Sequence, residues 1–238
     1  MGPTKDVARE IRLPRGDLGP AGRQLRAFRA LLRGVFQVFF RVRVRGLAGV
    51  PPGPIIICSN HLGWADTFLL LLFFPIEPRI YLLGNENVRD LTWFRTWIIN
   101  TLKILIPVDY GRPAQAVRVS LEVLRRSGSL VAFPEGTVEG TAEGRLLPLQ
   151  DGAAYLSQAA GVPLVPVGLT GTKQLWLRRT LTMRIGPAVY PAEFMGDRRE
   201  RAREQTTKLS AEMRALLPGD YERPRYKPLR RWLTNLFA

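Results

Sequence analysis

The chain contains a single histidine, His61, in the run Asn60-His61-Leu62-Gly63-Trp64-Ala65-Asp66, where Asp66 lies five positions after it. Histidine titrates near neutral pH, and a carboxylate bonded to one ring nitrogen leaves the other free to take a proton from an alcohol. Positions five apart differ by about 140° on one helix, so the two residues do not share a helix face. We therefore expect His61 in a strand-to-helix turn and Asp66 in the first turns of the helix. The pair is then a catalytic dyad; the alternative is a structural histidine with a chance neighbour.

A second group of polar residues follows a predicted strand over residues 129–133. Glu135, Gly136 and Thr137 offer a carboxylate, a backbone without a side chain and a hydroxyl, at the sheet edge that is expected to carry His61. Glu135 is predicted to accept a hydrogen bond from the hydroxyl of a bound substrate that acts as the acceptor of a transferred group. Backbone N–H groups beside Glu135 are predicted to hold an oxyanion. The alternative is an ordinary turn with a solvated glutamate.

The elements that must position these residues alternate between strands and helices. Predicted strands cover residues 55–58, 79–83, 106–108, 129–133, 163–167 and 181–185, and predicted helices cover 65–74, 91–105, 113–126, 152–160 and 200–216. This alternation predicts an α/β fold with a layered mixed sheet flanked by helices. Pro163 and Pro166 favour an edge or irregular strand. The apolar run 67–76 is too short to span a bilayer and is predicted to be a buried helix.

The amino-terminal part of the chain is strongly basic and amphipathic. Residues 1–45 hold eleven Lys and Arg against three acidic residues, and residues 22–42 are predicted to be a helix. Its apolar stripe comprises Leu25, Phe28, Leu32, Val35, Phe36 and Phe39. Such a helix is typical of a membrane interface, with arginines against anionic headgroups; the alternative is that the stripe covers the protein's own core. The predicted organisation is a flexible basic lead-in (1–21), an amphipathic interfacial helix region (22–48), an α/β domain (49–217) and a basic tail with an apolar end (218–238).

Composition narrows the class of partner. The formal net charge is +15, from 35 Lys and Arg against 20 Asp and Glu, which favours anionic partners. The net charge alone permits a basic nucleic-acid-binding protein, which is the alternative from another functional class. Zinc spacings, RNP-like aromatics and a helix-turn-helix pattern are missing from the sequence, so we expect no nucleic acid partner. The single cysteine, Cys58, excludes an intrachain disulfide and fits a reducing cytosol. With one histidine and one cysteine we expect no metal site, and the first twenty residues lack the apolar region of a secretory signal.

Four segments, which follow one another along the chain in the family's order, resemble the glycerolipid acyltransferase family, whose best-known member makes phosphatidate from lysophosphatidate. Residues 60–66 are similar to the family's Asn-His-x4-Asp block, and 133–137 to its Phe-Pro-Glu-Gly-Thr block. Residues 162–168 are similar to its last block. Residues 106–112 are similar to its second block, in which an arginine, here Arg112, helps to hold the acceptor.

The resemblance implies an O-acyltransferase at the cytoplasmic face of the cell membrane, peripheral or monotopic. His61 would be the general base and Asp66 its orienting partner. The acceptor, lysophosphatidate or a related lipid, would be bound by Asn60, Arg112, Glu135, Gly136 and Thr137. Acyl-CoA or acyl-carrier protein would be the co-substrate, with no bound cofactor. Residues 91–105 and 67–74 are candidate walls for the acyl chain.

The departures from the family pattern concern positive charge. Val138 stands where the family usually has arginine, Gln150 (or Asp151) where it has lysine, and Tyr110 where arginine is common. A phosphate in a dry pocket needs cationic or several N–H partners, and Arg145 and Lys173 are the candidates to compensate. The departures leave two alternatives open, an acceptor other than lysophosphatidate and an inactive relative that only binds lipid.

Overall fold

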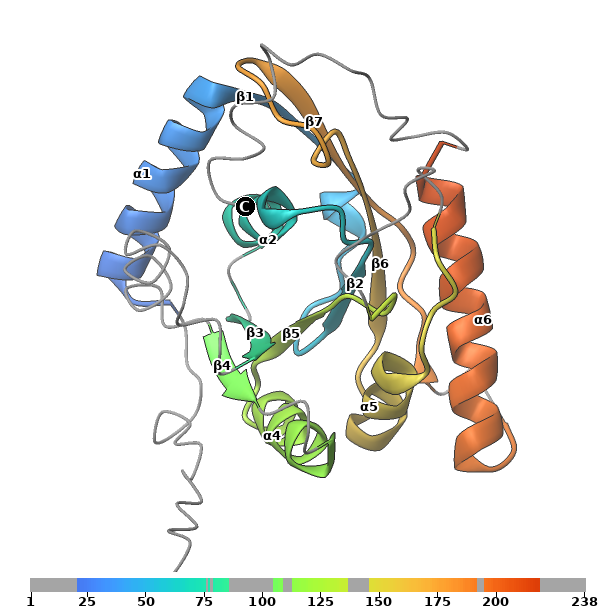
Figure 1. Cartoon of the computed structure of the whole chain (residues 1–238). Coiled ribbons are helices and arrows are strands. Elements are labelled where there is room, and N and C mark those ends of the chain that lie inside the picture. The colour runs from blue at the N-terminus through green and yellow to red at the C-terminus, as the bar shows by residue number, and fades with distance from the viewer. Residues whose placement is uncertain are drawn as a thin grey trace, which may run out of the picture.

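The computed structural model describes residues 21–75, 77, 79–85, 105–108, 113–136, 146–191 and 195–218. Within them, a seven-stranded sheet runs in the order β1-β7-β6-β2-β5-β3-β4, with helices on both faces (Figure 1). The predicted α/β class with a mixed, helix-flanked sheet is confirmed. The strands are β1 (Phe40–Arg45), β2 (Ile56–Ser59), β3 (Ile80–Asn85), β4 (Leu105–Val108), β5 (Ser129–Ala132), β6 (Leu164–Thr170) and β7 (Arg179–Ile185). The helices are α1 (Arg23–Phe39), α2 (Trp64–Phe73), α4 (Pro113–Arg125), α5 (Gly152–Ala160) and α6 (Arg198–Leu216).

The strand directions place three carboxyl ends side by side. β6, β2, β5, β3 and β4 run parallel, whereas β7 is antiparallel to β6 and carries β1 parallel to itself. In the register, Cys58 of β2 lies beside Ala132 of β5, and Ser59 of β2 lies beside Val167 of β6. The segments that leave β2, β5 and β6 therefore meet at one edge of the sheet, where sites of parallel α/β sheets usually form.

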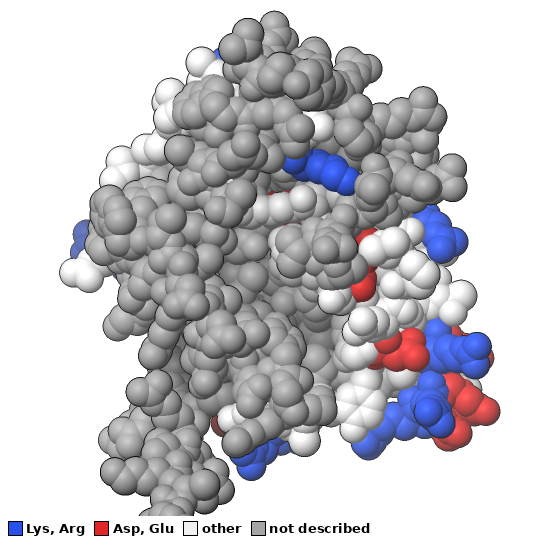
Figure 2. Space-filling model, in the orientation of Figure 1, with Lys and Arg blue, Asp and Glu red and all other residues white. Residues whose placement is uncertain are grey.

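Two hydrophobic clusters cover the two faces of the sheet. Ile57 of β2 belongs to the cluster that contains α1 and α2 residues, whereas Ile56 and Cys58 belong to the cluster that contains residues of α4, α5 and α6. This division follows the alternation of side chains along a strand. α2 buries most of its apolar side chains, so the prediction that the apolar run 67–76 forms a buried helix is confirmed as far as Phe73, where α2 ends. α6 instead exposes a mixed charged face, on which Figure 2 shows basic and acidic side chains together.

Two features of the sheet differ from the sequence-based predictions. The first helix ends at Phe39 rather than near Val42, because Phe40–Arg45 alternates apolar residues with Arg and pairs with β7 as an edge strand. The predicted strand with two prolines corresponds to β6, which is central rather than at an edge and lies between β7 and β2. Pro163 precedes this strand and accepts from the Ile56 N–H at 3.0 Å, and Pro166 accepts from the Gly186 N–H at 3.0 Å, so both prolines serve as acceptors only.

Helix α1 packs against α2 through both apolar and basic side chains. Phe36 is buried against Phe73 and Phe40, with ring centroids 6.0 and 4.8 Å away. Arg29 donates to the carbonyl oxygens of Leu71 (2.7 Å) and Phe74 at the end of α2. Two further arginines of α1 are also engaged by the protein, since Arg33 lies over the Phe73 ring and Arg26 pairs with Glu77. These arginines are therefore not simply a solvated face.

Several predictions fall on residues outside the described ranges. They concern the lead-in over residues 1–20, the basic tail from residue 219, and residues 91–104 of the helix predicted over residues 91–105. Leu105, the last residue of that predicted helix, begins β4 instead.

Candidate active site

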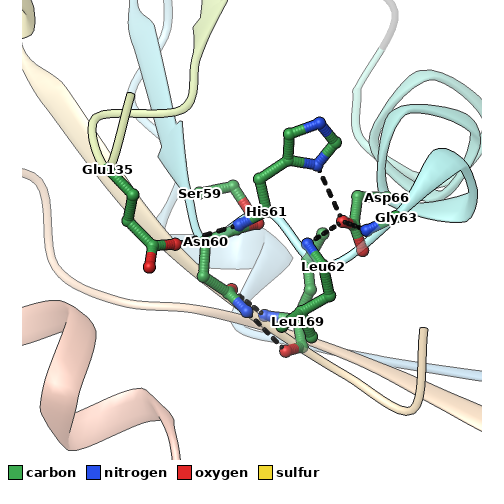
Figure 3. Close-up of polar contacts among 8 residues, drawn as sticks. All are labelled: Ser59, Asn60, His61, Leu62, Gly63, Asp66, Glu135 and Leu169. Atoms are coloured by element: carbon green, nitrogen blue, oxygen red, sulfur yellow. Dashed lines mark hydrogen bonds and ion pairs between the residues drawn. The ribbon is translucent and has the colours of Figure 1, made fainter. Parts of the chain in front are cut away.

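The turn between β2 and α2 brings His61 and Asp66 together, as the sequence predicts. His61 Nδ1 lies 2.9 Å from Asp66 Oδ2 (Figure 3). The same oxygen accepts from the backbone N–H groups of Leu62 (2.5 Å) and Gly63 (2.8 Å). Asp66 is the third residue of α2 and completely buried, so it closes the helix amino terminus while it holds the imidazole. Helix formation and orientation of His61 thus depend on one carboxylate.

The contact with Asp66 decides which ring nitrogen of His61 can act as a base. An ionised carboxylate can only accept, so in the neutral imidazole Nδ1 carries the hydrogen and Nε2 carries the lone pair. In Figure 3 the second ring nitrogen points away from Asp66. The His61 side chain is 15% exposed while that of Asp66 is 0% exposed. The arrangement therefore suits proton abstraction at Nε2 from a hydroxyl that reaches this edge.

Asn60 fixes the start of the turn by pairing with β6. Its amide Nδ2 donates to the Leu169 carbonyl at 2.9 Å, and its Oδ1 accepts from the Leu169 N–H at 2.7 Å. The side chain is fully buried, so the amide continues the pairing of β2 with β6 beyond the last strand residue. The predicted contact of Asn60 with the acceptor stays a prediction, because the described contacts of its amide are to the backbone.

The segment Phe133-Pro134-Glu135-Gly136 is a tight turn after β5. The Gly136 N–H donates to the Phe133 carbonyl at 3.1 Å, and proline second and glycine fourth are typical of such a turn. Gly136 has φ +70°, and a Cβ there would lie 2.2 Å from Gln150 Nε2, so glycine suits both the conformation and the space. The turn leaves Glu135 directed at the neighbouring β2–α2 turn.

Glu135 connects this turn to His61 and is not a solvated glutamate. One carboxylate oxygen accepts from the His61 N–H at 3.0 Å and the other from the Leu147 N–H at 3.0 Å. Burial raises the pKa of the Glu135 carboxyl, although the hydrogen bonds from Leu147 and His61 act in the opposite direction. Figure 3 shows Glu135 and Asp66 on opposite sides of His61. The expected role of Glu135 in acceptor binding is not tested by these contacts.

A further neighbour of His61 was not predicted from the sequence. The Phe133 ring stacks on the imidazole, with centroids 4.0 Å apart and planes 17° apart. The Pro-Glu-Gly sequence predicts a turn, but it contains no signal for the ring that the first turn residue contacts.

The remaining predicted site residues are only partly placed. Arg112 and Thr137 lie outside the described residues, as do Val138 and Arg145. Gln150 is exposed, donates from its backbone to the Pro134 carbonyl at 2.8 Å and lies next to Gly136. Lys173 is in the loop after β6, which approaches the β2–α2 turn at Gly63: a Cβ there would lie 3.6 Å from the Thr172 carbonyl oxygen.

Comparison with known proteins gives the same family as the sequence motifs. A family model described as Acyltransferase matches residues 41–170. Similar curated proteins include a 1-acyl-sn-glycerol-3-phosphate acyltransferase of Limnanthes alba (33% identical over 139 residues; 56% of this chain, 46% of the relative). Another, of Pseudomonas aeruginosa, is 32% identical over 170 residues, which are 66% of this chain and 62% of the relative. The chain spans about half the length of most curated relatives that it matches.

A solved structure shares the fold. The crystal structure of the 1-acyl-sn-glycerophosphate acyltransferase PlsC from Thermotoga maritima superimposes with a TM-score of 0.64. The match covers 85% of this chain and 81% of the other, at 21% sequence identity. This likeness shows the architecture of the fold.

Proposed function

The chain belongs to the acyltransferase family, and we propose that it transfers a fatty acyl group to a hydroxyl of a lysophospholipid-like acceptor at a membrane surface. The donor is acyl-CoA or acyl-carrier protein. The observation that carries the proposal is the contact of His61 Nδ1 with Asp66 Oδ2 at the carboxyl edge of the sheet. The names of the relatives point to lysophosphatidate as the first acceptor to test.

The proposed reaction is a direct transfer between two bound substrates. Nε2 of His61 removes the proton from the acceptor hydroxyl as its oxygen attacks the thioester carbon. A new C–O bond forms, the C–S bond breaks, and the departing thiolate takes the proton from the imidazolium. Asp66 holds the ring in one tautomer and stabilises its charged form while the proton is on it. A positioned base of this kind contributes about 10²–10⁴-fold to the rate.

Action at a membrane surface is supported by the exposed side of α1. Leu31, Val35 and Val38 are 64%, 49% and 64% exposed and fall within one arc of the helix. Of these three, only Val35 belongs to the predicted stripe, most of which packs on the core. Of the helices described, none has both the length and the hydropathy that a bilayer crossing demands. The exposed arc of α1 leads us to propose interfacial binding through this helix, and we propose the cytoplasmic face of the cell membrane because the family resemblance implies it.

One observation favours testing acceptors beyond lysophosphatidate. Gln150 stands where the family usually has lysine, and its amide lies beside Gly136 of the turn that contacts His61. A neutral amide holds a phosphate less strongly than an ammonium group does. A related lipid acceptor with a smaller or masked headgroup charge is thus the second candidate.

The decisive experiment follows thiol release from acyl-CoA by the purified chain with lysophosphatidate, other lysophospholipids and glycerol phosphate, with product identification by mass spectrometry. We expect acceptor-dependent thiol release by the parent and a loss of at least about 10²-fold in His61→Ala. The protein's own thiol will not contribute to the signal, because Cys58 is buried and burial raises the pKa of its thiol.

Two results would contradict the proposal. If thiol is released with none of these acceptors, either from acyl-CoA or from acyl-carrier protein in a parallel assay, the proposed activity is wrong. If His61→Ala keeps the parent rate, the proposed activity is retained, but the proposed role of His61 as the general base is wrong. Tyr155→Leu, on α5 and on the other face of the sheet from α2, is a control that removes an exposed ring and should leave the rate unchanged.

A further inference from the structure

The ring of Phe133 covers one face of the only imidazole in the chain. The centroids are 4.0 Å apart and the planes are inclined by 17°, which is a stacked rather than an edge contact. Phe133 is itself fixed on two sides: its carbonyl accepts from Gly136, and its side chain packs against the cluster that contains α2. The ring is thus held against His61 by the same turn that directs Glu135 to the His61 backbone.

We propose that Phe133 is a positioning residue whose π face stabilises the imidazolium that forms when His61 takes the acceptor's proton. This inference deepens the proposed function and rests on it. A cation over the face of an aromatic ring within about 6 Å is attracted by the ring quadrupole, most strongly where water is scarce. The neutral ring gains less from the same contact, so the stabilisation grows as the proton moves to His61.

Other charged groups around His61 must be separated from this effect. In the described part of the chain, Asp66 on α2 contacts the ring, and Glu135 after β5 accepts from the His61 backbone. Lys173 is carried by the loop after β6 and follows Thr172, whose carbonyl oxygen lies near Gly63. None of these groups changes when Phe133 is replaced by another side chain of similar size, so such replacements report on the π face itself.

The experiment uses Phe133→Leu, which keeps an apolar side chain without a π face, and Phe133→Tyr, which keeps the face. The imidazole signals of His61 are followed by NMR as a function of pH; the chain has no other histidine, so their assignment is unambiguous. The pH profile of kcat is recorded for the same proteins. Tyr155→Leu, which removes an aromatic face that lies under Arg198, is the matched control.

In Phe133→Leu we expect the imidazole of His61 to gain its proton about half a pH unit to one unit lower than in the parent, with kcat reduced about three- to tenfold. Phe133→Tyr and Tyr155→Leu should match the parent in both measurements. Identical titration of His61 in folded Phe133→Leu and in the parent would overturn the proposal.

A second variant covers the case in which leucine disturbs the fold. Pentafluorophenylalanine at position 133 keeps the ring shape while it reverses the sign of the ring quadrupole. It should shift the titration in the same direction as leucine and at least as far; an unshifted titration contradicts the proposal. Because the NMR titration needs no substrate, it remains informative even if no acceptor supports turnover, so failure of the proposed function is distinguishable from failure of this inference.

Discussion

At the scale of single residues, the site depends on the three N–H groups that converge on Asp66 Oδ2. They come from the ring of His61 and from the backbone of Leu62 and Gly63. An asparagine can present only one oxygen, and its amide nitrogen can donate to the imidazole and so select the wrong tautomer. We expect Asp66→Asn to lower kcat by about 10²–10⁴-fold, measured by thiol release. Retention of more than about a tenth of the parent rate, in a variant with the parent circular dichroism spectrum, would contradict this role.

Glu135 gives a prediction about stability and pH. Burial raises the pKa of its carboxyl above the ordinary value. Between the two values, the folded chain keeps a proton that the unfolded chain has lost, so the free energy of unfolding should fall as the pH rises through this window. Glu135→Gln removes this contribution, and it also leaves one of the two backbone N–H groups facing an amide nitrogen. We expect a lower stability overall and a flatter pH dependence than in the parent, measured by denaturant unfolding from about pH 4 to pH 8. An unchanged pH slope would show that Glu135 does not titrate differently in the folded state.

The contacts of these residues differ in whether they can be predicted from the sequence. The meeting of His61 and Asp66 is predictable, because a strand, a short turn and an apolar helix bring positions five apart together. The partner of Asn60 is not, since Leu169 lies 109 positions further along the chain and offers only backbone groups. A residue that contributes only its backbone can be of any type, so the sequence does not reveal such a partner. The same holds for the two N–H groups from which Glu135 accepts hydrogen bonds.

At the scale of elements, α1 and α2 are joined at the carboxyl end of α2. Arg29 donates to the Leu71 and Phe74 carbonyls, two acceptors that the helix leaves unpaired at its end. Burial lowers the pKa of its guanidinium, and repulsion from Arg33 acts in the same direction. Arg29→Met keeps the apolar stem but loses both hydrogen bonds, so we expect about 2 kcal/mol lower stability in denaturant unfolding.

A matched control for Arg29 lies one turn earlier on the same helix. Arg26 pairs with Glu77, and both side chains of this pair are about half exposed. Exposed ion pairs contribute little, so Arg26→Met should cost less than about 1 kcal/mol. Equal losses in the two variants would mean that the attachment of α1 to α2 does not depend on the carbonyls of α2.

Helices and strands that pack only on the protein's own core are predicted better than the segment in which the chain passes from a helix directly into a strand. The strands after residue 55 follow from their apolar runs and flanking turns, and α2, α4, α5 and α6 agree with the prediction within two residues. The prediction for residues 40–45 is wrong because apolar residues continue the helical spacing as far as Val42. The strict alternation of apolar residues with Arg in this segment is the better signal, since it fits a strand with one covered face.

At the scale of the whole molecule, the two stripes on α1 divide its apolar surface between the core and the outside. One side, which includes Phe36, is taken by α2 and β1, and the other, Leu31, Val35 and Val38, is exposed. Sequence periodicity detects that a helix is apolar on much of its surface, but the choice of covered side depends on where α2 lies. The net charge of +15 adds a long-range attraction to anionic surfaces that salt screens, whereas apolar insertion is much less sensitive to salt.

These two contributions can be separated by replacing the exposed stripe. We expect the triple variant Leu31→Ser, Val35→Ser, Val38→Ser to bind vesicles of anionic phospholipid at low salt and to be released at about 0.5 M salt, where the Debye length is only a few ångströms. The parent should stay bound at that salt concentration in a vesicle co-sedimentation assay. A matched triple variant, Leu47→Ser, Leu177→Ser, Met195→Ser, removes exposed apolar side chains outside α1 and should behave as the parent does. If both triple variants bind as the parent does at high salt, the exposed stripe of α1 is not the membrane contact, and the interfacial part of the proposed function fails while the chemistry at His61 is left standing.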